Sequence, residues 1–216
     1  MSKPVFLVAI AGNIGVGKST LTRYLSEQWG FDTVPEPESR NPFLKDFYKN
    51  PKRWALHSQL FFLTERAKMQ RRAEKTSQYL LLDRSIYEDA EVFAKTLLSK
   101  NEYKVYKRVY DFLLEDLTPP NFVVYLKASV PTLMERIKGR GRLYEKGIKR
   151  SYIKKLNERY DEWIANFTIA PVITIDTEKY EIYSLFDDIS EVKERIEKFF
   201  WSKDIKDGKH RRAKEI

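Results

Sequence analysis

The sequence predicts an α/β fold in which helices cover both faces of a parallel β-sheet. Short apolar runs alternate along the chain with segments that show helical spacing. The first run, residues 5–11, is almost continuously apolar, as expected of a strand that is buried on both faces. A glycine-rich turn and a helical segment follow it directly. Strands that alternate with helices in this way form parallel sheets.

Five strands are expected, with helices between them. The strands are predicted at residues 5–11, 32–34, 79–82, 122–126 and 172–175, and the second of these is the weakest. The first helix is predicted at residues 19–29, and residues typical of helix starts stand at Pro51, Ser129 and Ser151. The helix that starts at Pro51 is expected to turn its large apolar side chains to the core: Trp54, Leu56, Leu60, Phe61 and Leu63.

The length and charge of the chain favour one domain that acts on small molecules. The 216 residues contain no internal repeat and no linker, so we expect a single domain at residues 1–201 and a basic tail at residues 202–216. The formal charge of +9 would suit a nucleic-acid-binding protein, but lysines and arginines are interleaved with acidic residues throughout. The tail is therefore interpreted as a solvated end rather than a binding arm, and no nucleic-acid partner is expected.

The composition also excludes several kinds of site. Cysteine is absent, which excludes disulfides, zinc–thiolate sites and cysteine nucleophiles. No apolar run reaches the roughly 18 residues of a membrane span, so no membrane partner is expected. The basic-then-apolar pattern of a secretory signal is missing. Together these features predict a cytoplasmic protein.

A phosphate-binding motif follows the first strand. Residues 12–19 match the pattern G-x-x-x-x-G-K-[ST] between a strand and a helix. In such a loop the backbone N–H groups point at phosphate oxygens, and the helix N-terminus adds positive charge. Lys18 would reach the β- and γ-phosphates, and the Ser19 hydroxyl would ligate Mg²⁺. The predicted nucleotide-binding residues are Gly12, Asn13, Ile14, Gly15, Val16, Gly17, Lys18, Ser19 and Thr20.

Charged residues follow two further strands. Glu36 stands just after the weak second strand, and Asp83 and Arg84 follow the third. In a parallel sheet these strand ends face the same crevice as the phosphate loop. A glutamate there could take the proton from an attacking hydroxyl, an aspartate could hold Mg²⁺, and an arginine could stabilise phosphoryl charge. This combination favours a kinase for a small molecule, because the Asn-Lys-x-Asp motif of regulatory GTPases is absent.

The chain resembles the deoxyribonucleoside kinase family over nearly its whole length. The matching stretches, in order, are residues 12–20, 36–37, 47–48, 51–54, 59–66, 83–89, 136–148 and 152–163. The resemblance implies a P-loop kinase fold with a five-stranded parallel sheet and a short arginine-rich lid. It also implies that the γ-phosphoryl group of ATP is transferred to the 5′-hydroxyl of a deoxynucleoside, with Mg²⁺ as cofactor and a homodimer as the assembly.

The resemblance implies a role for each residue of the acceptor site. Glu36 would be the general base, and Arg84 would contact the 5′-hydroxyl and the transferred phosphate. The sugar 3′-hydroxyl would be held by Tyr48 and Glu145. The residues implied to surround the base are Gln59 at its edge, Arg66 and Asp89 behind Gln59, and Phe93 stacked on the ring.

The lid is expected at about residues 136–148. Arginines at positions 136, 140 and 142 and glycines at 139 and 141 indicate a flexible strip of forked cations that suits phosphate oxygens. The alternative is a basic helix C-terminus that ends at a glycine. By resemblance, Arg140 and Arg142 would close over the phosphates. Arg136, with the loop that contains Asp176 and Tyr180, would flank the adenine of ATP.

Three positions bear on the acceptor. In the thymidylate-kinase-like family an arginine precedes the Glu-Pro pair and binds an acceptor phosphate, whereas this chain has Pro35, which favours a neutral hydroxyl acceptor. Asn41 and Ser58 replace aromatic residues of some animal relatives and could leave room for a larger base, as in the bacterial purine-preferring branch. A nucleoside monophosphate kinase and a nucleotide- or nucleic-acid-binding protein without turnover remain the alternatives.

The residues behind Gln59 predict the preferred base. Arg66 and Asp89 form a polar pair that can satisfy a ring nitrogen and an exocyclic amine together, whereas thymine offers a carbonyl and a methyl group. An unpaired polar group of this kind costs about 1–3 kcal/mol. The expected order is therefore deoxyadenosine first, deoxyguanosine or deoxycytidine next, and thymidine last.

Overall fold

Five parallel strands form one sheet in the order β2-β3-β1-β4-β5. The computed structural model describes residues 4–179 and 186–207 of the chain. The strands are β1 (Phe6–Gly12), β2 (Asp32–Val34), β3 (Tyr79–Asp83), β4 (Phe122–Lys127) and β5 (Val172–Asp176). This arrangement confirms the predicted α/β fold with a five-stranded parallel sheet.

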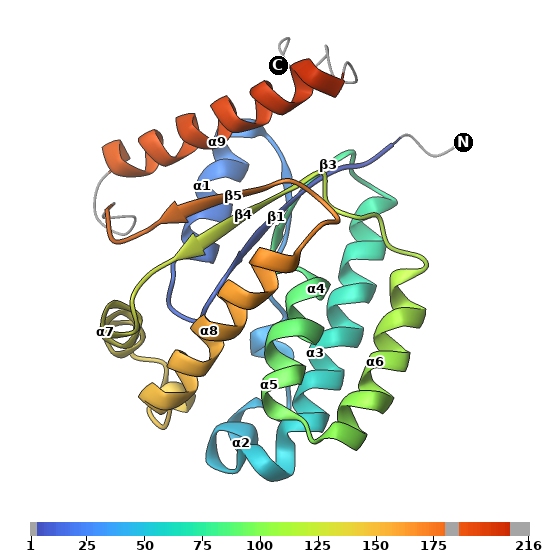
Figure 1. The fold of residues 1–216 in the computed structure, drawn as a ribbon, viewed down its shortest axis with the longest axis vertical. Coiled ribbons are helices and arrows are strands. Elements are labelled where there is room, and N and C mark those ends of the chain that lie inside the picture. Colours follow the sequence, from blue (N-terminus) through green and yellow to red (C-terminus); the bar gives the residue numbers. More distant parts are fainter. Residues whose placement is uncertain (1–3, 180–185, 208–216) are drawn as a thin grey trace.

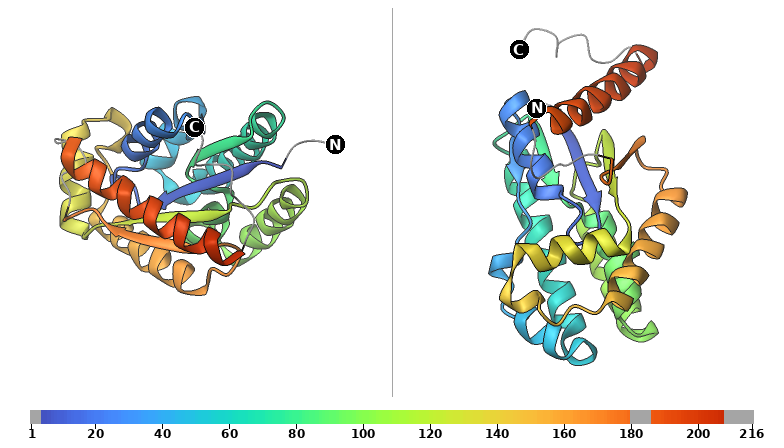
Figure 2. Two further views of the ribbon diagram at one scale, coloured as in Figure 1. Left: turned by 90° about the horizontal axis from the view of Figure 1, so that it is seen from above. Right: turned by 90° about the vertical axis from the view of Figure 1, so that its left-hand side faces the viewer.

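Helices cover the sheet on both faces (Figure 1 and Figure 2). One face carries α1 (Lys18–Trp29) and α9 (Phe186–Asp207), and the other carries α3 (Pro51–Glu74), α6 (Lys100–Leu114) and α8 (Arg150–Asn166). The shorter elements are η1 (Glu38–Arg40), α2 (Leu44–Lys49), α4 (Ile86–Glu88), η2 (Asp89–Ala94), α5 (Lys95–Leu97), α7 (Val130–Arg140) and η3 (Leu143–Glu145). Most of these shorter elements stand around the carboxyl ends of the strands, where they can build a site.

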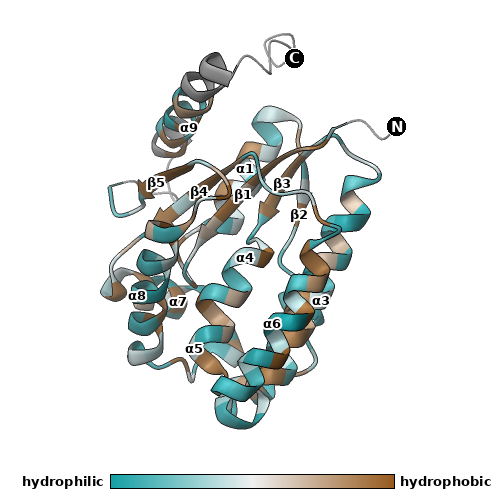
Figure 3. Cartoon of the chain, turned by 45° about the vertical axis from the view of Figure 1, so that its right-hand side comes forward, coloured by the Kyte–Doolittle hydropathy of each residue, from teal (hydrophilic) through white to brown (hydrophobic). Residues whose placement is uncertain are grey.

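The core consists of two apolar layers that the sheet separates. Along β1, Leu7 and Ala9 point to the layer beneath α3 and α8, whereas Val8 and Ile10 point to the layer beneath α1 and α9. All four are fully buried, as the period of two along a strand requires when both faces are covered. Figure 3 shows the result as hydrophobic strands enclosed by helices with hydrophilic outer faces.

The predicted strands are all present, and four have slightly different ends. β1 runs one residue further than expected and starts one residue later, and β3, β4 and β5 each gain one residue at the carboxyl end. The strands are longer at this end because the parallel pairing between neighbouring strands continues through the pairs Ile10–Asp83 and Lys127–Asp176. Asp83 is therefore the last residue of β3, and its position is fixed by the sheet.

The helix starts are mostly as predicted. Pro51 is the first residue of α3, and Ser129 caps α7 by accepting a hydrogen bond from the Thr132 N–H at 3.5 Å. The predicted start at Ser151 is wrong, because α8 begins one residue earlier, at Arg150. The backbone carbonyl of Lys149 accepts the first helical hydrogen bonds, and no side chain caps this end.

The prediction for the core face of α3 is confirmed in part. Leu63 is fully buried, and the half-buried Leu60 and Trp54 pack against core clusters, whereas Leu56 and Phe61 are only partly buried and belong to none. The buried stripe of α3 consists instead of Ala55, Ser58, Gln59, Leu63, Arg66, Ala67 and Gln70. A buried stripe with four polar side chains indicates that this helix forms the wall of a polar site.

Two further features differ from an ordinary pattern of helices. Between α4 and α5 the chain forms a π-helix, η2, in which the Lys95 N–H donates to the carbonyl of Ala90, five residues earlier. At the other end of the chain, α9 continues to Asp207, six residues into the segment expected to be a tail. Over residues 4–179 and 186–207, no helix combines the length and the apolar character that a membrane crossing requires.

Candidate active site

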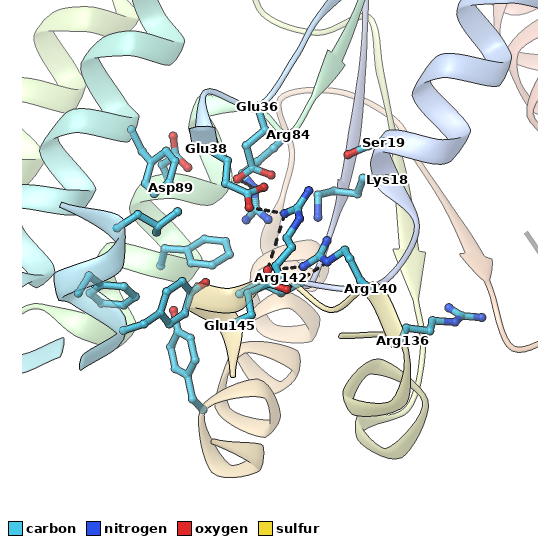
Figure 4. A pocket seen from close by; sticks show the side chains of 18 of the residues that line it. Lys18, Ser19, Glu36, Glu38, Arg84, Asp89, Arg136, Arg140, Arg142 and Glu145 are labelled. Atoms are coloured by element: carbon cyan, nitrogen blue, oxygen red, sulfur yellow. Dashed lines mark hydrogen bonds and ion pairs between the residues drawn. The ribbon is translucent and has the colours of Figure 1, made fainter. Parts of the chain in front are cut away.

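A polar cavity of about 250 Å³ lies at the carboxyl ends of β1, β2 and β3 (Figure 4). A crevice at this edge is the usual ligand site of an open parallel sheet. It brings together residues from positions 14 to 152 of the chain. The predicted site residues that line it are Ile14, Gly15, Gly17, Lys18, Ser19, Thr20, Glu36, Tyr48, Gln59, Arg66, Arg84, Asp89, Phe93, Arg136, Arg140, Arg142 and Glu145.

Glycine is required at two positions of the phosphate loop. Gly12 has a φ of 142°, and a Cβ there would lie 2.5 Å from the backbone oxygen of Leu126. Gly15 has a φ of 83°, and its Cβ would lie 2.9 Å from Cγ1 of Ile137. Positive φ angles and such close approaches both exclude larger residues. The loop is thus packed against β4 on one side and against α7 on the other.

Lys18 is held inside this loop as a buried cation. Its side chain is 6% exposed, and Nζ donates a hydrogen bond to the backbone oxygen of Asn13 at 3.1 Å. Burial and the positive charge of Arg84 lower the pKa of Lys18 to about 8, although Glu36 and Asp83 oppose the shift. Asn13 is itself anchored to α8, where Nδ2 donates to the backbone oxygen of Ile153 at 3.0 Å.

Ser19 and Asp83 form the part of the site that fits Mg²⁺. The Ser19 hydroxyl donates to Oδ2 of Asp83 at 2.5 Å. The other carboxylate oxygen, Oδ1, is buried and has no hydrogen-bond partner within the described part of the chain. Burial and the negative charge of Glu36 raise the pKa of Asp83. A hydroxyl and one unsatisfied carboxylate oxygen suit an ion that is held jointly with nucleotide phosphates.

Glu36 and Arg84 meet at the centre of the cavity. Nε of Arg84 lies 2.9 Å from Oε1 of Glu36, and its guanidinium carbon lies 4.3 Å from the centre of the Phe93 ring. Burial would raise the pKa of Glu36, but the charges of Arg84, Lys18, Arg66 and Arg142 outweigh it and lower the pKa to about 2. The carboxylate is therefore ionised at neutral pH and faces a group of cations.

The backbone of Arg84 is strained. Its φ of 76° makes it the one non-glycine residue with positive φ in the described ranges. Such a conformation costs on the order of 1–3 kcal/mol and persists only where the surroundings enforce it. The backbone N–H of Arg84 donates to the backbone oxygen of Ile10 at 3.1 Å, and the backbone carbonyl of Arg84 accepts from Nη1 of Arg66 at 3.3 Å.

The opposite end of the cavity contains a buried ion pair. Nε of Arg66 donates to Oδ2 of Asp89 at 2.7 Å, and the two side chains are 2% and 3% exposed. Gln59, two helical turns earlier in α3, is also buried. Asp89 and Phe93 both belong to the π-helix η2, which directs both into the cavity. π-Helical segments are frequent at functional sites for this reason.

The arginines of the predicted lid are already paired with acidic residues of the cavity (Figure 4). Nε of Arg140 donates to Oε2 of Glu145 at 3.1 Å. Nη1 of Arg142 forms an ion pair with Glu38 and lies 3.7 Å from Oε1 of Glu145. Tyr144 donates its hydroxyl to the same Glu38 oxygen. Residues 140–145 and the sequence-distant Glu38 thereby close one side of the cavity.

The lid is not a continuous flexible strip, which corrects the expectation. Residues 136–140 are the last turn of α7, which ends at Gly141 with a φ of 69°. This is the alternative of a basic helix C-terminus that ends at glycine. η3 follows and contains Glu145. Arg136 lines the cavity but donates its two Nη groups to the hydroxyl and the backbone oxygen of Thr177, at 2.8 and 2.9 Å.

Some predicted residues do not line the cavity. Gly12, Asn13 and Val16 belong to the phosphate loop but do not face the cavity, and Asp83 lies beneath Ser19. Asp176 ends β5, where Oδ1 accepts the Glu178 N–H at 3.1 Å, and Tyr180 lies outside the described residues.

Asn41 and Ser58 do not border the cavity either, which corrects the expectation that they enlarge the base pocket. Nδ2 of Asn41 donates to Oγ of Ser58 at 3.0 Å. The pair instead fastens the loop before α2 to α3.

The sequence analysis missed several residues of this region. Glu38 lines the cavity, and Tyr152 faces it from α8. Glu88 and Tyr160 lie just outside it and are fully buried. The signal for Glu38 was its place two residues after Glu36, but a glutamate beside prolines is indistinguishable from a solvated loop charge. No pattern in the sequence brings Tyr160 next to Glu88, because 72 residues separate them.

A phosphate loop at a helix N-terminus, cavity arginines and a carboxylate at the centre of the cavity are the features of a P-loop kinase, a class of phosphotransferases. A sequence model described as deoxynucleoside kinase matches residues 8–200. The chain is 35% identical over 199 residues to a deoxyadenosine/deoxycytidine kinase of Bacillus subtilis (strain 168), covering 88% of this chain and 91% of that one. It is 39% identical over 175 residues to a deoxyguanosine kinase of the same organism, covering 79% and 84%.

A solved structure supports the same assignment. The deoxyadenosine kinase of M. mycoides, with the products dCMP and a flexible dCDP bound, matches with a TM-score of 0.79 and 29% sequence identity. The match covers 89% of this chain and 100% of that one. The chain belongs to the deoxynucleoside kinase family, and the P-loop kinase fold and phosphotransferase class predicted from the sequence are confirmed.

Proposed function

We propose that this deoxynucleoside kinase transfers the γ-phosphoryl group of ATP to the 5′-hydroxyl of deoxyadenosine, and to deoxyguanosine or deoxycytidine less readily. The observation that carries the base preference is the buried pair of Arg66 and Asp89 in the cavity wall, 2.7 Å apart. The pair presents a donor and an acceptor at fixed positions, which suits a base with a ring nitrogen and an amine. Thymine would leave one of them unpaired.

In the proposed reaction Glu36 accepts the proton of the 5′-hydroxyl. The oxygen forms a bond to the γ-phosphorus, and the bond from that phosphorus to the bridging oxygen breaks, so that the electron pair leaves with ADP. A carboxylate with a pKa of about 2 is a weak base. Proton transfer is therefore expected late, after the new bond has begun to form and the hydroxyl has become acidic, as a loose transition state allows.

The cations of the cavity stabilise the charge on the transferred group. Lys18 reaches the phosphates from the loop, and Arg84 sits beside Glu36 at the point where the hydroxyl would arrive. We propose that Mg²⁺ is held by Ser19 and Asp83 together with the phosphates, where it would neutralise phosphate charge. Arg140 and Arg142 would exchange their carboxylate partners for phosphate oxygens.

Tyr48 and Glu145 are proposed to hold the sugar 3′-hydroxyl. Both line the cavity between the lid and α2, and the ring of Tyr48 stacks on Tyr144 with centroids 6.0 Å apart. Gln59 and Phe93 would contact the base. A deoxynucleoside would therefore be contacted at its 3′-hydroxyl, at the edge of its base and on the face of its base.

The test is phosphoryl transfer from ATP to the four deoxynucleosides and their monophosphates, measured as kcat/KM. We expect deoxyadenosine to be best and thymidine worst, with no transfer to the monophosphates. Thymidine as the best substrate would contradict the role of Arg66 and Asp89, and transfer to monophosphates alone would support a nucleotide kinase instead. Binding of ATP without nucleoside-dependent release of ADP would contradict the enzyme function.

We also propose that the enzyme is a homodimer that associates through α6. Val105 and Phe112 are 56% and 66% exposed, and they lie seven residues apart on one face of this helix. An exposed apolar stripe of this kind suits a partner surface. Sedimentation equilibrium gives the mass in solution and distinguishes a dimer from a monomer of 25.7 kDa.

A further inference from the structure

A second carboxylate, Glu88, lies close to Arg84 but outside the cavity. Glu88 is the last residue of α4 and is fully buried. Oε1 accepts the Ser85 N–H at 2.8 Å, and Oε2 accepts the Gly12 N–H at 3.4 Å. It is thereby joined both to the turn that follows β3 and to the first residue of the phosphate loop. A buried carboxylate whose two oxygens both accept backbone hydrogen bonds is held in one orientation, so it can fix the position of a group that binds it.

Tyr160 of α8 connects this carboxylate to Arg84. Its hydroxyl lies 2.6 Å from Oε2 of Glu88 and 3.0 Å from Nη1 of Arg84. A guanidinium has no acceptor, so the hydroxyl must accept from Arg84 and donate its one proton to Glu88. Burial raises the pKa of Tyr160 well above its ordinary value, which keeps this proton in place. The direction of both hydrogen bonds is thus fixed by chemistry.

We propose that Glu88 and Tyr160 are positioning residues that hold the guanidinium of Arg84 in register with the phosphate loop. This inference rests on the proposed role of Arg84 in phosphoryl transfer. Glu36, the partner of Arg84 inside the cavity, takes up a proton during the proposed reaction and must turn to the substrate. Glu88 does not line the cavity, so its hold on Arg84 through Tyr160 persists through the whole cycle.

The strained backbone of Arg84 is the reason why the hydrogen bond to Tyr160 matters. With a φ of 76°, Arg84 needs its surroundings to keep it in place. The side chain has three constraints: the Glu36 carboxylate at 2.9 Å, the Phe93 ring at 4.3 Å and the Tyr160 hydroxyl at 3.0 Å. Of these, only the hydroxyl is directed by a group outside the cavity. Loss of the hydroxyl is therefore expected to disturb the orientation of the guanidinium rather than ligand binding.

Tyr160 also packs in the core, and the experiment must separate its ring from its hydroxyl. The ring stacks on Tyr125 with centroids 5.9 Å apart and meets Phe93 edge-on at 6.1 Å. Tyr160→Phe keeps both contacts and removes the hydroxyl alone. Tyr125→Phe is the matched control, because this neighbour is equally buried in the same stack but its hydroxyl donates to Asp161 at 3.1 Å, away from Arg84.

Steady-state kinetics of the full chain test the inference. We expect Tyr160→Phe to lower kcat on the order of 10–100-fold, since a small misplacement of a catalytic group is enough for such a loss. The KM for the nucleoside and for ATP should stay within about threefold, and Tyr125→Phe should leave kcat within about twofold. Glu88→Gln keeps the shape of the side chain, so it should also lower kcat at nearly constant KM even if Tyr160→Phe folds poorly.

The outcomes separate this inference from the proposed function. Normal kcat in both Tyr160→Phe and Glu88→Gln, with a large loss in Arg84→Ala, would overturn the positioning role alone. Normal kcat in Arg84→Ala would instead overturn the proposed role of Arg84. Equal losses of kcat in Tyr160→Phe and Tyr125→Phe would show that the loss does not depend on the hydroxyl bond to Arg84, and would also overturn the positioning role.

Discussion

The two ends of the cavity differ in how their charged groups are prepared for a ligand. At the base end, Arg66 and Asp89 are 2% and 3% exposed and bind each other directly. At the lid end, Arg140 and Arg142 are 33% and 34% exposed and bind Glu145 and Glu38. A pair in which both members are buried is expensive to separate, whereas a partly exposed arginine can leave its carboxylate at a lower cost because water solvates the guanidinium.

This difference indicates two ways of using charge. The base end has a fixed pattern of donors and acceptors, which under the proposed function would select a base that matches the pattern. The lid end has cations that are paired with carboxylates, and in the proposed reaction phosphates would compete for them, so their contacts could strengthen as charge develops on the transferred group. The first arrangement suits specificity and the second suits catalysis.

The largest expected effect is at the junction of the two ends. Glu36→Gln removes the proposed proton acceptor, and we expect kcat to fall roughly 10²–10⁴-fold. Nucleoside affinity, measured by calorimetry, should change only a few-fold because the amide keeps the shape of the side chain. Nearly normal turnover of Glu36→Gln would exclude this residue as the base. The two ends of the cavity would then have no catalytic carboxylate between them.

A smaller effect is expected at the lid end. Arg142→Ala should lower kcat by about 10²-fold, because it removes a donor that acts on developing charge. The KM for the nucleoside should change little. Arg159→Ala, which removes a similarly exposed arginine that pairs with Glu162 outside the cavity, is the matched control. If Arg142→Ala weakens nucleoside binding and leaves kcat unchanged, the lid end would bind the nucleoside as the base end does. The proposed difference between a catalytic end and a selective end would then be wrong.

At the base end we expect a change of preference rather than of rate. Asp89→Asn replaces the acceptor of the buried pair with an amide and leaves Arg66 without its closest carboxylate. The ratio of kcat/KM for deoxyadenosine over thymidine should fall by about tenfold, which corresponds to one unsatisfied polar contact. Glu91→Gln, on the exposed side of the same helical segment, should leave the ratio unchanged. An unaltered ratio in Asp89→Asn would remove base recognition from this pair.

The smallest expected effect is a pH dependence of ATP binding. Burial and Arg84 lower the pKa of Lys18 to about 8 in the free enzyme, whereas bound phosphates favour its charged form. Binding of ATP therefore takes up a proton above this pKa, and affinity must fall as pH rises through it. From pH 7 to pH 8.5 the dissociation constant should increase roughly fourfold. Lys18→Arg, which stays charged, should abolish the dependence, and a wild-type constant that is flat over this range would contradict the lowered pKa.

The sequence was sufficient for the elements that a periodic pattern encodes. The strand at the phosphate loop has a continuous apolar run, and Gly12 and Gly15 stand where close backbone contacts require glycine. α3 was the exception, because its buried stripe is polar. Apolar spacing selected Leu56 and Phe61, whereas tertiary contacts bury Ser58 and Gln59.

Side chains whose partners are distant in sequence could not be placed. The contact between Arg142 and Glu38 spans 104 residues, and nothing local distinguishes either residue from an ordinary surface charge. The π-helix at Asp89 was equally hidden, since its extra residue per turn leaves no mark on the sequence. Resemblance to a family supplied the roles of the residues, and the fold supplied their contacts.

The packing of Gly15 against Ile137 limits how the lid end can move. Because Cγ1 of Ile137 fills the place that a Cβ of Gly15 would occupy, α7 is seated on the phosphate loop. The carboxyl-terminal turn of α7 therefore cannot move independently of the phosphate loop. Gly141, where an added Cβ would meet only the backbone oxygen of Gly139 at 4.0 Å, is the first position after α7 that is not packed in this way. Arg136 and Arg140 are therefore fixed together with α7, whereas Arg142, which follows Gly141, would be the first arginine to move in any opening of the proposed lid.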